Sequence, residues 1–199
     1  MATTEELGTD GRPRPRRADA ERNLSALLES AKAVFAASGV DAPAKEITDA
    51  AGLGVGTLYR HFPRRADLIV AVLQHEIDAC ADAATALGTL HTPYEALRLW
   101  VRDYVDLVGT KRGLAAALHS GETTFAGLHG YVAERLEPAV DTLLAAAVEA
   151  GEIAAKVEVH ELLVALSLLC QPVPVVDLDL DYHLRMVTVF VEGLRPGPD

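Results

Sequence analysis

The chain has 199 residues, of which half are hydrophobic and 24 % are charged, and its formal net charge is −11. This length and composition allow one domain, or two small ones, with a real hydrophobic core. No apolar run approaches the about 20 residues that a membrane span needs. No apolar segment follows the N-terminal arginines as in a signal peptide, so we expect a cytoplasmic protein without a membrane anchor.

The negative charge is not spread evenly along the chain. Residues 1–65 hold ten Arg and Lys against nine Asp and Glu, for a net charge of +1, whereas residues 66–199 hold eight against twenty, for a net charge of −12. An even distribution would argue against nucleic acid, because DNA binding needs cations that face the phosphates. The first third of the chain can therefore approach DNA, while the acidic remainder faces solvent or a partner.

The N-terminal third predicts a basic arm followed by two helices. Residues 11–17 place four arginines and two prolines where we expect no persistent helix. Residues 1–18 are interpreted as a disordered basic arm, either a solvated tail or a segment that folds onto DNA. A first helix is predicted from Asp19 to Ala37, with Gly39 as its C-terminal stop, and a second helix from Pro43 to about Ala51, which Gly52 ends.

A third, short helix is predicted within the stretch GLGVGTLYRHF, from Gly52 to Phe62. Leu58 and Phe62 are four residues apart and would face the core together, which directs Thr57, Arg60 and His61 elsewhere. A dinucleotide loop is not expected, because that motif follows a strand and has another glycine spacing. The glycines instead indicate a helix N-terminus that can approach a phosphate closely.

The rest of the chain predicts six further helices. The first runs from Arg64-Arg65 to about Leu87, with a break at Gly88, and the second from Pro93 to Val108, with a stop at Gly109. The other expected bounds are Lys111 to about His119, Phe125 to Ala150 with Pro138 kinking or dividing it and Gly151 ending it, Val159 to Cys170, and Asp181 to Leu194. No strand pattern or internal repeat is present. We therefore predict an all-α fold of about nine helices.

The first part of the chain resembles the TetR (tetracycline-repressor-like) family of transcriptional regulators, over about Arg22 to Val72. The resemblance rests on Ala31, Phe35, Gly39, Ile47, Ala51-Gly52, Gly56-Thr57-Leu58-Tyr59, His61-Phe62, Arg65 and Leu68. It implies a three-helix helix-turn-helix DNA-binding domain at residues 19–65. The six acidic, aliphatic helices of residues 66–199 look like the larger ligand-binding and dimerisation domain of that family.

Carried over to this sequence, the resemblance implies that Gly54 to His61 form the recognition helix in the major groove of a double-stranded DNA operator. Thr57 and Tyr59 would bond phosphate oxygens and fix the register, and Arg60 would reach the O6/N7 edge of guanine, which discriminates by about 1–3 kcal/mol. The residues expected to contact DNA are Gly54, Val55, Gly56, Thr57, Tyr59, Arg60, His61 and Arg65.

Three positions qualify this assignment. Ala44 and Gly54 stand where family members often have a hydroxyl that bonds phosphate. Val55 stands where a Lys or Arg is common, and it could touch a thymine methyl, which leaves more of the base reading to Arg60. His61 and Arg65 are expected at phosphates. Tyr59 could instead be a core residue, as Leu58 and Phe62 are expected to be.

The second domain is expected to bind an unknown small-molecule effector that is apolar or weakly polar, because no cluster of positive charge appears there. Candidate pocket residues are Trp100, Tyr104, His119, Phe125 and His129, although residues of these types are more often core residues than pocket residues. A regulator of this type would form a homodimer through Val159 to Cys170 and Asp181 to Leu194, whose apolar faces exceed what one partner needs. The resulting function is a repressor that binds a palindromic operator and is released by an inducer.

Two other classes of function are weighed against this one. An enzyme is not expected, because the chain has no HExxH pair, no nucleophile-elbow string and no Cys/His cluster at metal spacing. We likewise expect no catalytic residue, no cofactor and no metal, and Cys80 and Cys170 are interpreted as reduced core residues. The remaining alternative is a helical small-molecule-binding module without sequence-specific DNA binding.

Overall fold

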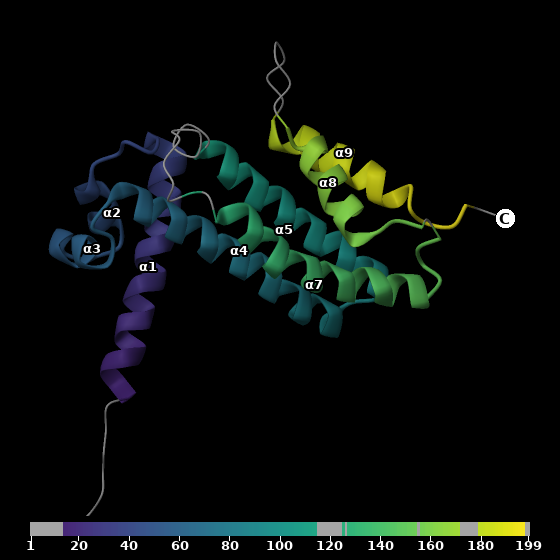
Figure 1. The fold of residues 1–199 in the computed structure, drawn as a ribbon, viewed down its shortest axis with the longest axis horizontal. Coiled ribbons are helices and arrows are strands. Elements are labelled where there is room, and N and C mark those ends of the chain that lie inside the picture. Colours follow the sequence, from purple (N-terminus) through teal and green to yellow (C-terminus); the bar gives the residue numbers. More distant parts are fainter. Residues whose placement is uncertain (1–13, 115–124, 126, 155, 172–178, 198–199) are drawn as a thin grey trace, which may run out of the picture.

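The computed structural model describes residues 14–114, 125, 127–154, 156–171 and 179–197 (Figure 1). These residues form eight α-helices and no strand, which confirms the predicted all-α class. The helices are α1 Arg14–Ser38, α2 Ala44–Ala50, α3 Val55–His61, α4 Arg65–Leu90, α5 Pro93–Gly113, α7 Leu128–Glu149, α8 Val159–Leu169 and α9 Leu180–Glu192. No helix in the described part of the chain is long and apolar enough to cross a membrane.

Two hydrophobic clusters form the core, and the long helix α4 belongs to both. The first cluster joins α1, α2 and α3 to the first half of α4, from Ala66 to Leu73. The second joins the other half of α4, from Ile77 to Ala84, to α5, α7, α8 and α9. Figure 1 shows α4 leaving the small helices α2 and α3 and running along α5 and α7. A change in the tilt of α4 is therefore felt in both clusters.

The predicted helix stops at Gly39, Gly52 and Gly151 are confirmed by backbone geometry. All three glycines have positive φ angles, of 80°, 66° and 70°. A residue with a Cβ is strained in that region, so glycine there ends a helix at little cost. Gly52 matters most for function, because it sets the direction of the chain between α2 and α3.

Several predicted boundaries are wrong, and two of them involve glycine. Helix α4 passes through Gly88 to Leu90, where we expected a break, and a Cβ on Gly88 would lie 3.4 Å from Leu143 Cδ2 of α7. Glycine there permits close packing of the two helices. Helix α5 continues through Gly109 to Gly113, because the cost of about 1 kcal/mol for one helical glycine is outweighed by tertiary packing. The predicted helix from Lys111 therefore begins inside α5, and residues 115–124 lie outside the described residues.

At the two proline-containing segments, the start of α1 differs from expectation, and of the two outcomes expected at Pro138, a kink or a division, the division is wrong. Helix α1 begins at Arg14, so residues 14–18 are helical, which the sequence did not suggest. Pro15 lies in the first turn, where the amides have no intrahelical acceptor and a missing N–H costs little. Pro138 lies inside α7 without dividing it, and its neighbours Leu136 and Val140 are fully buried. The buried face offsets the lost hydrogen bond. The rest of the predicted arm, residues 1–13, lies outside the described residues.

Candidate nucleic-acid interface

The turn between α2 and α3 holds α3 in a fixed orientation. Ile47 and Thr48 of α2 are fully buried, and Ile47 anchors this helix to the first cluster. The Leu53 amide donates to the Thr48 carbonyl at 2.9 Å, and the Gly52 amide donates to the Asp49 carbonyl at 3.2 Å. The connection is therefore short and hydrogen-bonded, as a helix-turn-helix requires.

Helix α3 has a buried inner face and an exposed outer face. Leu58 is 3 % exposed and belongs to the first core cluster, against which the half-buried Phe62 packs. Gly54 is the extended residue before the helix, and its carbonyl accepts the first bond, from the Thr57 amide at 2.8 Å. The prediction that Leu58 and Phe62 support this helix from behind agrees with the packing.

The outer face of α3 carries the polar side chains that the sequence singles out. Tyr59 is 55 % exposed, so the core interpretation of this residue is wrong. Arg60 and His61 are exposed as well, and Val55 and Thr57 are partly exposed. Arg60 forms no ion pair with another residue in the described ranges, which leaves its guanidinium available to a ligand.

Gly54 and Gly56 are surrounded by open space rather than by the protein. A Cβ built on either residue would have no other atom within 4 Å. Their φ angles also lie outside the left-handed region, so packing within the chain does not require glycine there. A bare backbone at this point allows the sugar-phosphate chain of a nucleic acid to come close.

Arg65 differs from the other candidate residues because its side chain turns inward. Its Nε donates to the Val40 carbonyl at 2.6 Å, and its guanidinium carbon lies 4.9 Å from the centre of the Phe35 ring. Its Nη2 is buried without a hydrogen-bond partner among the described residues. Burial lowers the pKa of Arg65 from its ordinary value. Arg65 thus links α4 to the α1–α2 turn, and its phosphate contact stays a prediction.

Two exposed cations on the elements before and after α3 were not among the expected DNA contacts. Lys45 of α2 forms an ion pair with Asp49 at 2.5 Å, and Arg64 donates to both carboxylate oxygens of Asp67, at 2.6 and 3.1 Å. The sequence signal is the four-residue spacing on α2 for Lys45 and Asp49, and for Arg64 and Asp67 the three-residue spacing between the N-cap of α4 and an acidic residue in its first turn. Asp49 and Asp67 compete with phosphate for Lys45 and Arg64. Arg60 has no such carboxylate partner among the described residues, so its positive charge is the least compensated of these three cations.

Of the residues expected to line an effector pocket, the three whose side chains the structure describes, Trp100, Tyr104 and Phe125, belong to two different core clusters. Trp100 is fully buried and its indole N–H donates to the Cys80 carbonyl at 2.8 Å. The ring of Tyr104 stacks on it at 5.7 Å, and both lie in the second cluster, whereas Phe125 lies in the first. His119 and the side chain of His129 lie outside the described residues. The two free cysteines are buried, as expected, and burial raises the pKa of Cys80 to about 12.

Comparison with known proteins agrees with this geometry. Residues 27–72 match the family described as bacterial regulatory proteins, tetR family. Residues 92–196 match the family described as transcriptional regulator SbtR-like, C-terminal domain. A TetR transcription regulatory protein from Mycobacterium vanbaalenii is 36 % identical, with 92 % of this chain and all of that chain covered and a TM-score of 0.73. The chain belongs to the TetR family of transcriptional regulators.

Other relatives support the same membership in the TetR family. A TetR regulator from Streptomyces coelicolor is 31 % identical over 88 % of this chain and 99 % of its own, with a TM-score of 0.71. The transcriptional repressor KstR of Mycobacterium tuberculosis is 34 % identical over 79 residues, which cover 38 % of this chain. That match spans about a third (35 %) of KstR. TetR proteins are DNA-binding regulators and not enzymes, so the expectation against an enzyme is confirmed.

Proposed function

We propose that this protein is a repressor that binds a palindromic operator as a homodimer and is released by a small, apolar or weakly polar effector. The observation that carries the proposal is the outer face of α3. A short helix is fixed from behind by the buried Leu58, while Tyr59 and Arg60 remain exposed. An exposed arginine on a rigid recognition helix is suited to bidentate reading of guanine in the major groove.

Within this proposal the side chains of α3 divide into positioning and reading groups. Thr57 and Tyr59 bond phosphates through their hydroxyl groups and set the register of the helix on the duplex. Arg60 reads guanine, and Val55, which is partly exposed at the first turn, touches a thymine methyl. His61 follows on the exposed side and adds a phosphate contact. Sequence discrimination therefore depends mainly on Arg60.

Dimer formation is supported by apolar side chains that α8 and α9 leave exposed. Leu168 is 66 % exposed and Val189 is 65 % exposed, and Val164 and Leu180 are each more than 40 % exposed. Contact between these helices and their copies in a second subunit would bury this surface. A two-fold dimer then presents two α3 helices to major grooves about 34–36 Å apart, or a multiple of that distance.

Repression is supported by the name of one relative, and release by the thermodynamic linkage between effector binding and DNA binding. KstR is named a transcriptional repressor. An effector releases DNA only if it binds the form that is incompetent for DNA more tightly than the competent form. A site that contacts both core clusters can meet this condition, because α4 belongs to both of them.

Selection of bound sequences from random double-stranded DNA tests the proposal. The whole 199-residue chain should enrich a palindrome whose half-sites are separated by about one helical turn or a multiple. Folded dimer that enriches no sequence, even at low salt, would contradict the repressor function and favour a small-molecule-binding module that does not read DNA. Sedimentation of the same sample confirms that the dimer is present.

A further inference from the structure

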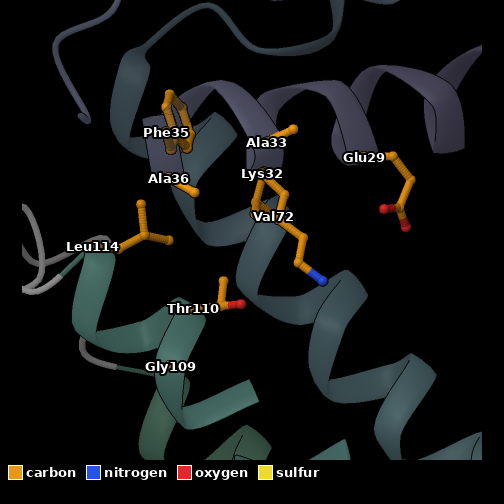
Figure 2. Close-up of a pocket in the computed structure, with 9 residues that line it drawn as sticks. All are labelled: Glu29, Lys32, Ala33, Phe35, Ala36, Val72, Gly109, Thr110 and Leu114. Carbon is orange, nitrogen blue, oxygen red and sulfur yellow. The ribbon is translucent and has the colours of Figure 1, made fainter. Parts of the chain in front are cut away.

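A cavity of about 370 Å³ lies where α1, α4 and the end of α5 meet (Figure 2). Its lining residues are Glu29, Lys32, Ala33, Phe35 and Ala36 of α1, Val72 of α4, Gly109 and Thr110 of α5, and Leu114. Ligand pockets commonly measure about 300–1,000 Å³, so this cavity has room for a small molecule. Trp100, Tyr104 and Phe125, which were expected in an effector pocket, do not line it.

The two charged side chains among the lining residues, Glu29 and Lys32, already have partners on α4. Lys32 forms an ion pair with Glu76 of α4, and Glu29 lies 3.1 Å from the imidazole of His75, also on α4. An ion bound beside Glu29 or Lys32 would have to compete with these partners, which weakens its binding. The charge pattern therefore favours a neutral ligand.

The rest of the wall is apolar, with a single hydroxyl group. Ala36, Val72 and Leu114 present aliphatic surface, and the Phe35 ring lies beside them. The Thr110 hydroxyl donates to the Asp106 carbonyl at 3.3 Å, so its oxygen remains able to accept a hydrogen bond. Gly109 adds open space, because a Cβ on it would have no neighbour within 4 Å. These walls suit a largely apolar molecule with one hydrogen-bond donor.

The position of the cavity connects ligand binding to the DNA-binding part of the chain. Helix α1 packs through Leu27, Ala31 and Phe35 in the cluster that holds α3, whereas α5 packs through Trp100 and Val105 in the other cluster. A molecule between α1 and α5 contacts elements of both clusters. Any change that it makes in the spacing of these helices alters the support of the recognition helix.

We propose that this cavity is an effector site for a neutral, largely apolar small molecule, and that occupancy changes the affinity for DNA. The effect on DNA affinity rests on the proposed function, whereas ligand binding in the cavity does not. Ala36 and Ala37 are adjacent, exposed residues of α1, but only Ala36 lines the cavity. This pair provides a matched test.

The binding test uses the full chain without DNA and the probe 1-N-phenylnaphthylamine, a neutral fluorophore that brightens in apolar surroundings. Ala36→Leu fills the cavity from α1 and Gly109→Leu fills it from α5, so each should weaken probe binding about tenfold or more, while Ala37→Leu should bind as the wild type does. Circular dichroism checks that each variant is folded, and two independent walls keep the test valid if one variant is not. Wild-type protein that binds no probe, or cavity variants that bind it unchanged, would overturn the site.

The coupling test adds operator DNA obtained by selection. Saturating probe should change the operator affinity of the wild type and of Ala37→Leu by about tenfold, and should not change that of Ala36→Leu. Unchanged wild-type affinity would overturn the regulatory half of the proposal. If the protein binds the probe but the probe-free protein binds no DNA, the proposed function is contradicted while the cavity remains a binding site. Failure of the proposed function is therefore distinguishable from failure of the site.

Discussion

Arg65 is the residue for which the family resemblance and the structure suggest different roles, and Arg65→Met separates them. The substitution keeps the aliphatic stem and removes the guanidinium that joins α4 to the Val40 carbonyl and the Phe35 ring. A hydrogen bond from a charged donor contributes about 1.5 kcal/mol at the low end of its range, which suits a partly exposed side chain. The contact with Phe35 adds about 0.5 kcal/mol.

One term acts in the opposite direction. The Nη2 group is buried without a partner among the described residues, and its removal returns about 1 kcal/mol. The net loss in the free energy of unfolding is therefore about 1 kcal/mol, which lowers Tm by about 2–4 °C for a chain of this length. Arg60→Met is the control, because Arg60 is exposed and forms no ion pair with a described residue; its Tm should not change.

The assay combines thermal unfolding with DNA affinity measured at several salt concentrations. Each phosphate contact contributes about 0.9 to the slope of log affinity against log salt. If Arg65 is a structural link, Arg65→Met lowers Tm and leaves this slope unchanged. A slope reduced by about 0.9 with an unchanged Tm would refute the structural role and restore the phosphate contact.

Three further predictions concern other parts of the chain. Leu168→Asp, on the exposed face of α8, should convert the dimer to a monomer in sedimentation, whereas Leu90→Asp, on an equally exposed residue of α4, should not. Gly52→Ala places a side chain at a φ of 66° and should lower the free energy of unfolding, measured by urea titration, by about 1 kcal/mol. Gly54→Ala is the control, because the φ of Gly54 is negative. An equal loss of stability in both variants would contradict the role of the Gly52 backbone. Burial raises the pKa of Tyr104 from 10.0 to about 12, so between these pH values the folded state holds more protons than the unfolded state. The free energy of unfolding should therefore fall as pH rises from about 10 to 12. Tyr104→Phe should make that fall smaller in urea titrations across this pH range.

Local signals predicted much of the helix-turn-helix. The stops at Gly39 and Gly52 follow from the freedom of glycine at positive φ, and the inward position of Leu58 follows from helical spacing. Such features depend on residues a few positions apart. The bounds of α8 and α9 were also close to prediction, because nearly continuous apolar patterns leave few alternatives.

Features set by distant contacts were not predictable in this way. Gly88 and Gly109 remain helical because neighbouring helices decide their conformation, and intrinsic propensity is too weak to override that packing. Trp100 is a core residue because a carbonyl 20 positions away accepts its N–H group. A sequence pattern cannot distinguish such an aromatic residue from one that lines a pocket.

The cavity was missed for the same reason. Its small residues are Ala33 and Ala36 on α1 and Gly109 on α5. Gly109 lies more than 70 positions after the two alanines, and each of the three alone looks like an ordinary helix residue. The spacing of three between the two alanines places them on one face of α1, next to the core stripe. That face was a usable signal, but only the fold supplies the opposite wall.

The measurement that tests the central claim most directly compares Arg60→Ala with the wild type on the selected operator, on operators with single base-pair substitutions, and on random DNA. If α3 reads DNA through Arg60, the variant loses about 1–3 kcal/mol of discrimination at one base pair in each half-site, and its affinity for random DNA falls much less. An equal loss of affinity for operator and random DNA would show that Arg60 reads no base, and would contradict the role assigned to the outer face of this helix.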